Sequence, residues 1–323
     1  MKRPTVSVVI KAYNHEKYVA QSIDSILTQS FQDFELVVTD DGSTDATPEI
    51  IRSFTDPRIS FERFERNRGI SQAMNATVAR ARGEFVAILN SDDFALPGRL
   101  ETQVAFLREH PDVAAVFSLP RQVGEEGEPV EGLGSLFDFP FDEPNPSRLA
   151  WLRQFFFRGN SLCAPSAMVR RAVLNEIGPD DPRLFNLQDF DRWIRLLEKH
   201  EIFVMTEALT AFRVRANQAN ASAPRHGQTL RVAFEFFEIY KRYRAFAPQF
   251  LREIFAEDLL RNGIDASGPS GTWLAELAVL GETPWHHLFA LDTLYEAASD
   301  DAGYRRLREL AASVNPFRIP NPA

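Results

Sequence analysis

Residues 83–93, GEFVAILNSDD, contain an uninterrupted run of five apolar side chains that leads into two carboxylates. A short apolar run bounded by glycine and polar residues is typical of a strand that is buried on both faces of a parallel sheet. Residues 34–45, FELVVTDDGSTD, follow the same pattern and also lead into a pair of carboxylates. Ligands of open α/β sheets bind outside the carboxyl ends of the strands, so both carboxylate pairs are predicted to face one crevice.

The residues around these two strands alternate between strand and helix patterns. Further strands are predicted where apolar residues cluster or alternate, at residues 6–10, 59–64 and 113–117. Helices are predicted at residues 17–29, 47–54, 71–82 and 97–110. Strands that alternate with helices pair in parallel through crossover helices, so we expect an α/β fold with a mostly parallel sheet flanked by helices.

The second part of the chain departs from this alternation. Residues 120–146 are rich in Gly, Pro and acidic residues and are expected to form a long loop over the crevice. Helices are then predicted at residues 147–157, 171–177 and 188–200, and strands at residues 166–169 and 202–205. Only helical patterns follow residue 217. We therefore expect an α/β domain at residues 1–216 and an all-helical domain at residues 217–323.

The composition limits the class of protein. A formal net charge of −9 argues against a general nucleic-acid binder, which usually carries a basic surface. The single cysteine excludes an intrachain disulfide and fits a reducing compartment. No stretch approaches the roughly 20 apolar residues that span a bilayer, and the N-terminal apolar run is too short for a signal peptide. A cytoplasmic protein is expected, with peripheral attachment to the inner face of the membrane left open.

Carboxylates that gather at neighbouring strand ends repel one another unless a cation compensates them. Hard oxygen ligands suit Mg²⁺ or Mn²⁺, which bridge phosphate oxygens and need only one or two protein carboxylates. Asp92 is therefore predicted to be the main metal ligand, and Asp93 a second ligand or an orienting group. For Asp93, capping of the next helix is a credible alternative. The sequence thus predicts a Mn²⁺ or Mg²⁺ cofactor that carries a phosphorylated ligand.

Three further side chains have both a structural and a functional interpretation. Tyr13 follows the first strand, where it could stack on a flat base or simply pack. Asp41 lies in a DDGS turn, and its carboxylate could accept the ring N–H of uracil or thymine. Asp189 lies in the first turn of the helix predicted at residues 188–200, where capping is the commoner role and general-base catalysis the alternative.

Taken in order, these segments resemble the glycosyltransferase family 2 pattern, with its GT-A fold built on a Rossmann-like, mixed and mostly parallel sheet. The resemblance covers roughly residues 5 to 215. No single segment is specific for the family, but the ordered set is. The segments are SVVIKAYN, SILTQSFQDFELVVTDDGSTD, NRGISQAMN, ARGEFVAILNSDD, LPGRLE, SAMVRRAVLNEIG and QDFDRWIRL.

The resemblance implies an inverting transfer of a sugar from a nucleoside-diphosphate donor, expected to be UDP- or dTDP-linked, to a hydroxyl acceptor. Asp92 would then hold the metal, and Asp189 would be the catalytic base. The acceptor is expected to be a sugar or a lipid-linked glycan in cell-surface polysaccharide or glycan synthesis. Residues expected to bind the donor, with Tyr13 and Asp41 at the base, are Ala12, Tyr13, Asn14, Asp41, Asn67, Asn90, Ser91 and Arg215.

The sequence departs from the family pattern at four positions. Asn90 replaces the usual first Asp of the DxD motif, which removes one negative charge. Lys11 stands where Pro is common, and Gln188 stands where Glu commonly precedes the base. Arg215 stands where many members have a His; Arg is not a metal ligand but can pair with a diphosphate. These changes bear on metal affinity more than on the fold.

Two other functions remain open on the sequence alone. A sugar-phosphate nucleotidyltransferase uses a similar sheet, but no Gly-rich loop bearing Arg or Lys follows the first strand of this chain. A non-catalytic nucleotide-sugar binding protein would account for Asn90 and Arg215. The donor sugar, the acceptor and the oligomeric state are not encoded in any residue pattern that we recognise.

Overall fold

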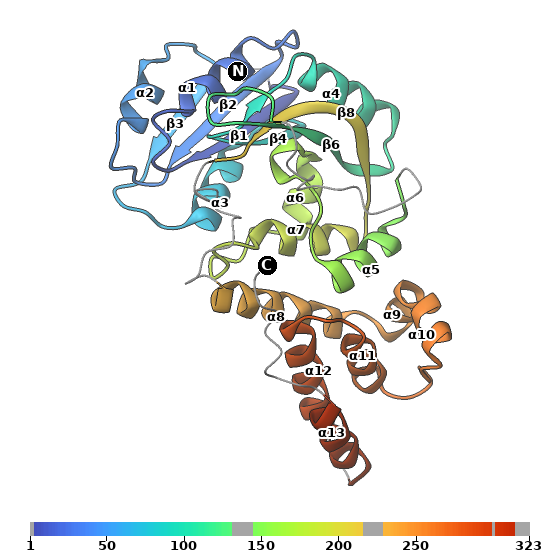
Figure 1. Ribbon diagram of the computed structural model, residues 1–323. Coiled ribbons are helices and arrows are strands. Elements are labelled where there is room, and N and C mark those ends of the chain that lie inside the picture. Colours follow the sequence, from blue (N-terminus) through green and yellow to red (C-terminus); the bar gives the residue numbers. More distant parts are fainter. Residues whose placement is uncertain (1–2, 131–144, 216–228, 299–300, 314–323) are drawn as a thin grey trace. The chain divides into compact units, whose positions relative to one another are not determined.

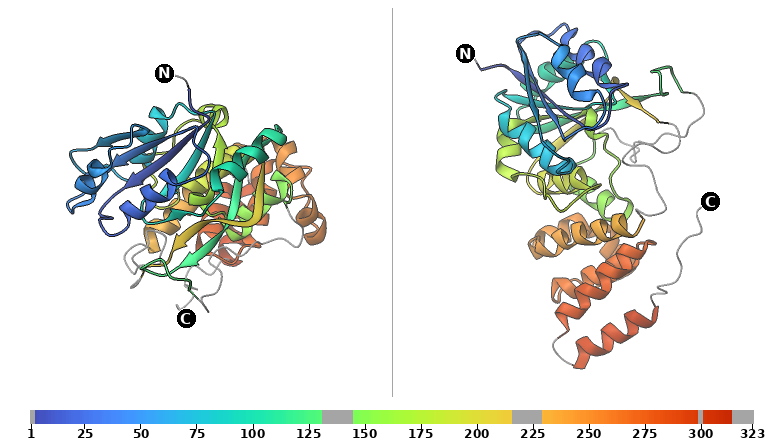
Figure 2. Two further views of the ribbon diagram at one scale, coloured as in Figure 1. Left: turned by 90° about the horizontal axis from the view of Figure 1, so that it is seen from above. Right: turned by 90° about the vertical axis from the view of Figure 1, so that its left-hand side faces the viewer.

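The computed structural model describes four stretches of the chain (Figures 1 and 2), namely residues 3–130, 145–215, 229–298 and 301–313. The chain divides into two compact units. The first unit comprises Met1–Arg148 and Asn160–Ala223, and the second comprises Leu149–Gly159 and Pro224–Ala323. None of the helices in the described stretches is both long and apolar enough to cross a membrane.

The first unit is built on one mixed sheet. Its strands are β1 (Val6–Ala12), β2 (Phe34–Asp40), β3 (Ile59–Arg63), β4 (Phe85–Asn90), β5 (Phe94–Ala95), β6 (Val113–Val123), β7 (Met168–Arg170) and β8 (Glu201–Arg213). Across the described residues the strand order is β3-β2-β1-β4-β7-β6-β8-β5. β1 lies between β2 and β4 and is parallel to both, whereas β7 is antiparallel to β4 and β6. The centre of the sheet therefore presents three parallel carboxyl ends side by side.

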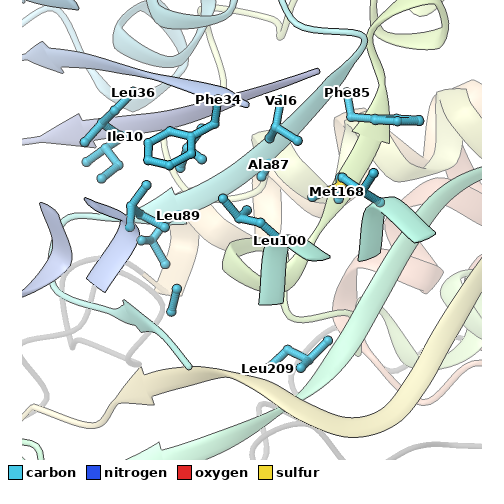
Figure 3. Packing of buried hydrophobic residues seen from close by; sticks show 14 of the residues in the cluster. Val6, Ile10, Phe34, Leu36, Phe85, Ala87, Leu89, Leu100, Met168 and Leu209 are labelled. Atoms are coloured by element: carbon cyan, nitrogen blue, oxygen red, sulfur yellow. The ribbon is translucent and has the colours of Figure 1, made fainter. Parts of the chain in front are cut away.

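Helices cover the two faces of this sheet. They are α1 (Val19–Leu27), α2 (Thr47–Ser53), α3 (Ile70–Arg80), α4 (Arg99–Glu109), α6 (Arg171–Ile177) and α7 (Gln188–Leu197). On one face, alternate residues of β1, namely Val6, Val8 and Ile10, share an apolar cluster with Ile23 of α1 and Leu100 of α4. Figure 3 shows part of this cluster, which forms the main core of the unit.

The opposite face of the sheet carries α3 and α7. Side chains alternate along a strand, so Lys11 of β1 points away from the apolar cluster. On Lys11's side of the sheet, Thr77 of α3 donates a hydrogen bond to Thr39 of β2 at 2.7 Å. The ring of Trp193 on α7 packs edge-on against Phe117 of β6 at 4.9 Å. The polar end of β1 thus faces the side on which these two helices lie.

The second unit is helical throughout its described residues. Its helices are α5 (Arg148–Arg158), α8 (Thr229–Ala245), α9 (Pro248–Ile254), α10 (Ala256–Asn262), α11 (Ser270–Val279), α12 (Pro284–Ala297) and α13 (Asp301–Ser313). The ring of Phe156 on α5 lies 5.4 Å from that of Tyr240 and 4.9 Å from that of Phe255. Arg153 of α5 also pairs with the buried Asp258 at 2.5 Å. These contacts explain why α5 belongs to this unit.

The predicted fold class is confirmed, but two strands are longer than predicted. β6 continues to Val123 and β8 reaches Arg213, whereas the sequence predicts strands only at residues 113–117 and 202–205. For β6, Pro120 is the reason that the predicted strand is too short, since proline lacks an N–H for the ladder. It lies beside a shift in the β6–β8 register, and such irregular positions tolerate proline in a strand.

The domain organisation differs from the prediction in one respect. The sequence predicts the helix at residues 147–157 as part of the α/β domain, whereas α5 lies in the helical unit. The predicted boundary between residues 216 and 217, and residues 131–144 of the predicted loop, lie outside the described residues.

A buried carboxylate ties the amino-terminal part of the sheet together. Glu35 of β2 is nearly fully buried and accepts hydrogen bonds from Ser7 Oγ at 2.6 Å and from Arg82 N and Nε at 2.7 and 2.8 Å. Burial alone would raise the pKa of Glu35, but these hydrogen bonds hold its pKa below the ordinary value.

We expect Glu35→Gln to lower the free energy of unfolding by about 2 kcal/mol at neutral pH, because an amide N–H would then face donors. Since the folded-state pKa is lowered, the wild-type advantage is present above the ordinary Glu pKa of 4.5 and is lost as the pH falls through the folded value. Urea unfolding at neutral and acidic pH measures both effects. Glu62→Gln, an exposed position on β3, is the control and should stay within about 0.5 kcal/mol of wild type. If the difference in free energy of unfolding between wild type and Glu35→Gln stayed the same at acidic pH, the ionised Glu35 carboxylate would not be its cause.

Candidate active site

The turn that follows β1 contacts both acidic segments. The carbonyl oxygen of Ala12 accepts a hydrogen bond from the backbone N–H of Asp41 at 2.8 Å. Lys11 Nζ donates to Asn90 Oδ1 at 2.7 Å, and the ring Nδ1 of His15 lies 2.7 Å from Ser91 Oγ. Residues from the carboxyl ends of β1, β2 and β4 therefore converge, as the sequence predicts for an open α/β sheet.

Asp41 holds a neighbouring loop. Its side chain is buried and accepts hydrogen bonds from the backbone N–H groups of Arg68 at 2.7 Å and Gly69 at 3.0 Å. Burial raises the pKa of Asp41 in spite of these two bonds. Gly42 has φ +72°, and a Cβ atom there would lie 2.4 Å from the carbonyl carbon of Arg66. Glycine is therefore required for the loop to approach this carboxylate.

Tyr13, predicted to bind the base, and two further predicted donor-binding residues, Asn14 and Asn67, lie on the same turn or on this loop. Asn14 has φ +51°, a left-handed conformation that Asn tolerates better than most residues. Its side-chain oxygen accepts a hydrogen bond from the N–H of Thr44 at 2.9 Å. Asn67 accepts from the N–H of Gly69 at 3.1 Å. Tyr13 is 43% exposed. A fixed turn thus presents an accessible aromatic ring.

In the NSDD segment, Asp93 is the more constrained carboxylate. Asp93 Oδ1 accepts from the backbone N–H of Arg213 at 2.8 Å, and Asp93 Oδ2 accepts from Asn90 Nδ2 at 2.8 Å. Burial and the adjacent Asp92 carboxylate raise the pKa of Asp93 to about 8. The sequence leaves three roles open for Asp93, namely second ligand, orienting group and cap of the next helix. This geometry favours the orienting group, and α4 has no side-chain cap hydrogen bond.

Asp92 instead lies near positively charged or ionisable groups. Its Oδ2 atom is 3.8 Å from Arg215 NH1 and also 3.8 Å from His15 Nε2. Arg215 NH1 lies 3.0 Å from His15 Nε2, and because a guanidinium only donates, this ring nitrogen must accept. His15 is thereby fixed as the neutral Nδ1–H tautomer, which donates to Ser91 Oγ. Burial lowers the pKa of His15 and favours the same neutral form.

In this arrangement Asp92 is the carboxylate that is suited to bind a divalent ion. Among the residues that the structure describes, no three His, Cys, Asp or Glu side chains gather into a metal-binding group. Mg²⁺ and Mn²⁺ nevertheless need only one or two protein carboxylates when phosphate oxygens supply the remaining ligands. Asp92, which takes no part in the hydrogen bonds that occupy Asp93, fits such a single-ligand site.

Asp189 begins α7 within the same unit. Its Oδ1 atom accepts from the backbone N–H of Phe190 at 2.9 Å, and Asn160 Nδ2 lies 3.3 Å from its Oδ2 atom. Burial raises the pKa of Asp189, and the nearby Arg192 guanidinium only partly opposes this effect. A raised pKa makes a carboxylate a better proton acceptor. Burial lowers the pKa of Lys11, whereas the Asp92 and Asp189 carboxylates both act to raise it.

Sequence reasoning missed a pair of side chains that hold the NSDD segment. Arg213 is almost completely buried at the end of β8 and donates to the carbonyl oxygens of Asp92 at 2.7 Å and Gly124 at 3.0 Å. Its guanidinium lies 4.9 Å from the ring of Tyr18, whose hydroxyl donates to Glu125 at 2.8 Å. We call Arg213 and Tyr18 the clamp. No local sequence pattern predicts it, because Arg213, Tyr18, Asp92 and the Gly124–Glu125 backbone come from four distant segments.

An open α/β sheet with polar loops at its central strand ends is a scaffold whose ligands bind at the carboxyl ends of the strands. A family model described as Glycosyl transferase family 2 matches residues 7–178, which is more than half of the chain. The chain is 34% identical over 219 residues to an uncharacterized glycosyltransferase of Methanocaldococcus jannaschii, a match that spans 66% of this chain and 72% of that relative. The chain therefore belongs to glycosyltransferase family 2 and is a glycosyltransferase.

Two solved structures have a similar fold. S. aureus TarS 1–349 in complex with UDP-GlcNAc aligns with a TM-score of 0.62 and 21% identity over 98% of both chains. The mannosyltransferase PcManGT from Pyrobaculum calidifontis, in complex with GDP-Man and Mn²⁺, aligns with a TM-score of 0.57 and 20% identity over 97% of this chain and 87% of that one. At these identities the likeness shows the fold alone.

The tight approach at Gly42 makes a testable difference between two left-handed glycines. Gly263→Ala, where no atom lies within 4 Å of the added Cβ, should cost about 1 kcal/mol for its left-handed backbone conformation. Gly42→Ala should cost about 2 kcal/mol more, because the loop at Arg66 must move. Urea unfolding of both variants measures the difference. Equal losses would mean that the loop does not rest on Gly42.

Proposed function

We propose that this glycosyltransferase transfers a sugar from a UDP-linked donor to a hydroxyl of a sugar or lipid-linked glycan, with inversion at the anomeric carbon. The observation that carries the proposal is the pair of contacts that joins the carboxyl ends of β1, β2 and β4: Lys11 donates to Asn90 at 2.7 Å, and Ala12 accepts from the N–H of Asp41 at 2.8 Å. Asp92 follows β4, Asp189 begins α7, and both carboxylates act electrostatically on the Lys11 ammonium. Such an arrangement can hold a leaving diphosphate and a proton acceptor close to one sugar ring.

The base of the donor would bind at the turn after β1. Tyr13 is exposed there and can stack on a flat ring. Asp41 uses one lone pair of each oxygen for backbone N–H groups, and a carboxylate has further lone pairs for the ring N–H of uracil. The UDP-GlcNAc complex of TarS, which has this fold, supports UDP as the first donor nucleotide to test. Ala12, Asn14 and Asn67 would complete this part of the site.

Asp189 would act as the general base. Its carboxylate takes the proton of the acceptor hydroxyl, and the acceptor oxygen attacks C1 of the sugar from the face opposite the diphosphate. A bond forms between the acceptor oxygen and C1, while the bond from C1 to the diphosphate oxygen breaks and UDP leaves. Asn160 Nδ2 and the N–H of Phe190 hold the carboxylate in one orientation for this step.

Asp92 would hold Mn²⁺ or Mg²⁺ together with the diphosphate, and the bound ion would neutralise charge on the leaving group. Asp93 and Asn90 would orient this segment, since their side chains are joined by a hydrogen bond of 2.8 Å. Ser91 would contribute by fixing His15, and Arg215 would pair with the diphosphate.

We expect Asp189→Asn to keep UDP binding and to lose at least about 100-fold in turnover, because the amide cannot accept the proton. Release of UDP from a panel of UDP-sugars, with and without simple sugar acceptors, measures turnover. Asp181→Asn, a nearby carboxylate paired with the exposed Arg183, is the matched control and should retain activity. Turnover of Asp189→Asn close to wild type would exclude Asp189 as the base.

We also expect Mn²⁺ to tighten UDP binding and Asp92→Ala to abolish this gain. Isothermal titration of UDP with Mn²⁺ and with a chelator measures it for each variant. Asp93→Asn should keep most of the gain, because its carboxyl already serves hydrogen bonds to Asn90 and Arg213. If Asp92→Ala gained as much affinity from Mn²⁺ as wild type, Asp92 would not be a metal ligand.

A further inference from the structure

Two basic side chains, Lys11 and Arg215, lie beside the segment that contains Asp92, the proposed metal ligand. The Lys11 ammonium lies 2.7 Å from Asn90 Oδ1, and Arg215 NH1 lies 3.8 Å from Asp92 Oδ2. Both cationic side chains belong to the first unit and are only partly buried. Two basic side chains therefore flank the segment on which a divalent ion would bind.

Lys11 is held where an anion can reach it. In the register of the sheet it lies opposite Thr39 of β2 and Asn90 of β4, at the carboxyl end of the strands. Within the described part of the chain, its hydrogen-bond partner is the neutral amide oxygen of Asn90. An ammonium has three donors, so two remain for a ligand.

No carboxylate among the described residues forms a direct ion pair with Lys11. Burial lowers its pKa, while the Asp92 and Asp189 carboxylates act to raise it and Arg192 acts to lower it. Arg192 itself is paired with the buried Asp180. A partly buried ammonium without a bonded carboxylate is stabilised by any anion that enters beside it.

Arg215 is fixed in orientation on the other side of Asp92. Its NH1 group donates to His15 Nε2 at 3.0 Å, and its guanidinium lies 5.2 Å from the ring of Tyr18. His15 is neutral in this arrangement, so it does not cancel or add to the charge of Arg215. A guanidinium held in this way loses little side-chain entropy when it pairs with phosphate oxygens.

We propose that Lys11 and Arg215 bind the donor diphosphate directly, so that UDP binds this enzyme even without a divalent ion. The inference rests on the proposed UDP-linked donor. The two side chains supply a charge comparable to that of one divalent ion, Lys11 as a point charge and Arg215 as a planar donor. A metal at Asp92 then strengthens a diphosphate site that already exists. Lys11 is thereby a diphosphate-binding residue, which the sequence alone does not indicate.

The test compares UDP with uridine, which lacks the diphosphate, by isothermal titration in chelator and in Mn²⁺. For the wild type, we expect UDP affinity in chelator to stay within about tenfold of that in Mn²⁺. Lys11→Met and Arg215→Met should each weaken UDP binding in chelator by about tenfold or more and leave uridine binding unchanged. Lys17→Met, an exposed lysine of the same segment, is the matched control and should bind UDP as the wild type does.

The outcomes separate this inference from the proposed function. If the wild type binds UDP in Mn²⁺ but not in chelator, the proposed donor stands and the inference is wrong. If both Met variants bind UDP in chelator as tightly as wild type, the inference is also wrong. Binding of UDP in neither condition would overturn the proposed donor itself. Lys11→Gln, which can keep the hydrogen bond to Asn90, replaces Lys11→Met if the latter fails to fold, and the same tenfold loss is expected.

Discussion

The parallel pairing of β1 with both β2 and β4 is the constraint on which the site depends. Its register sets Ala12 beside Asp40 and Lys11 beside Asn90, so that two acidic segments meet at one strand end. A shift by one residue would turn every side chain of β1 to the other face of the sheet. Val8 and Ile10 prevent such a shift, because both are completely buried in the apolar cluster.

The features that follow from local patterns could be predicted from the sequence. Apolar runs and helical spacing were sufficient to predict the fold class. The two acidic segments were sufficient to predict that the ends of β2 and β4 lie close together, since both segments consist of contiguous residues. The clamp of Arg213 and Tyr18 could not be predicted, because it joins β8 to residues nearly 200 positions earlier, as the Arg213–Gln21 hydrogen bond illustrates. The role of Asp93 likewise depends on its hydrogen bond with Arg213. The different roles of Asp92 and Asp93 could therefore be inferred only from the folded chain.

Burial gives the acidic groups of this site different chemical characters. Asp92 remains beside cations, whereas Asp93 and Asp189 have raised pKa values for which burial is the main cause. At Asp93 both oxygens serve the surrounding chain, but at Asp189 the carboxylate sits at the start of a helix and is held by Asn160. The departures from the family pattern at Lys11, Asn90 and Arg215 fall in this same small region.

The path of the chain through α5 has a practical consequence for dissecting this enzyme. The polypeptide leaves the α/β unit after Arg148, contributes one helix to the helical unit and re-enters at Asn160. A truncation that removes everything after residue 216 would remove the aromatic neighbours of α5 and uncover Phe156, which is wholly buried in the intact chain and packs against Tyr240 and Phe255. Exposed aromatic surface of this kind favours aggregation. The α/β unit is thus interrupted in the chain by a helix of the other unit, and loss of solubility on truncation would report on this helix and not on activity.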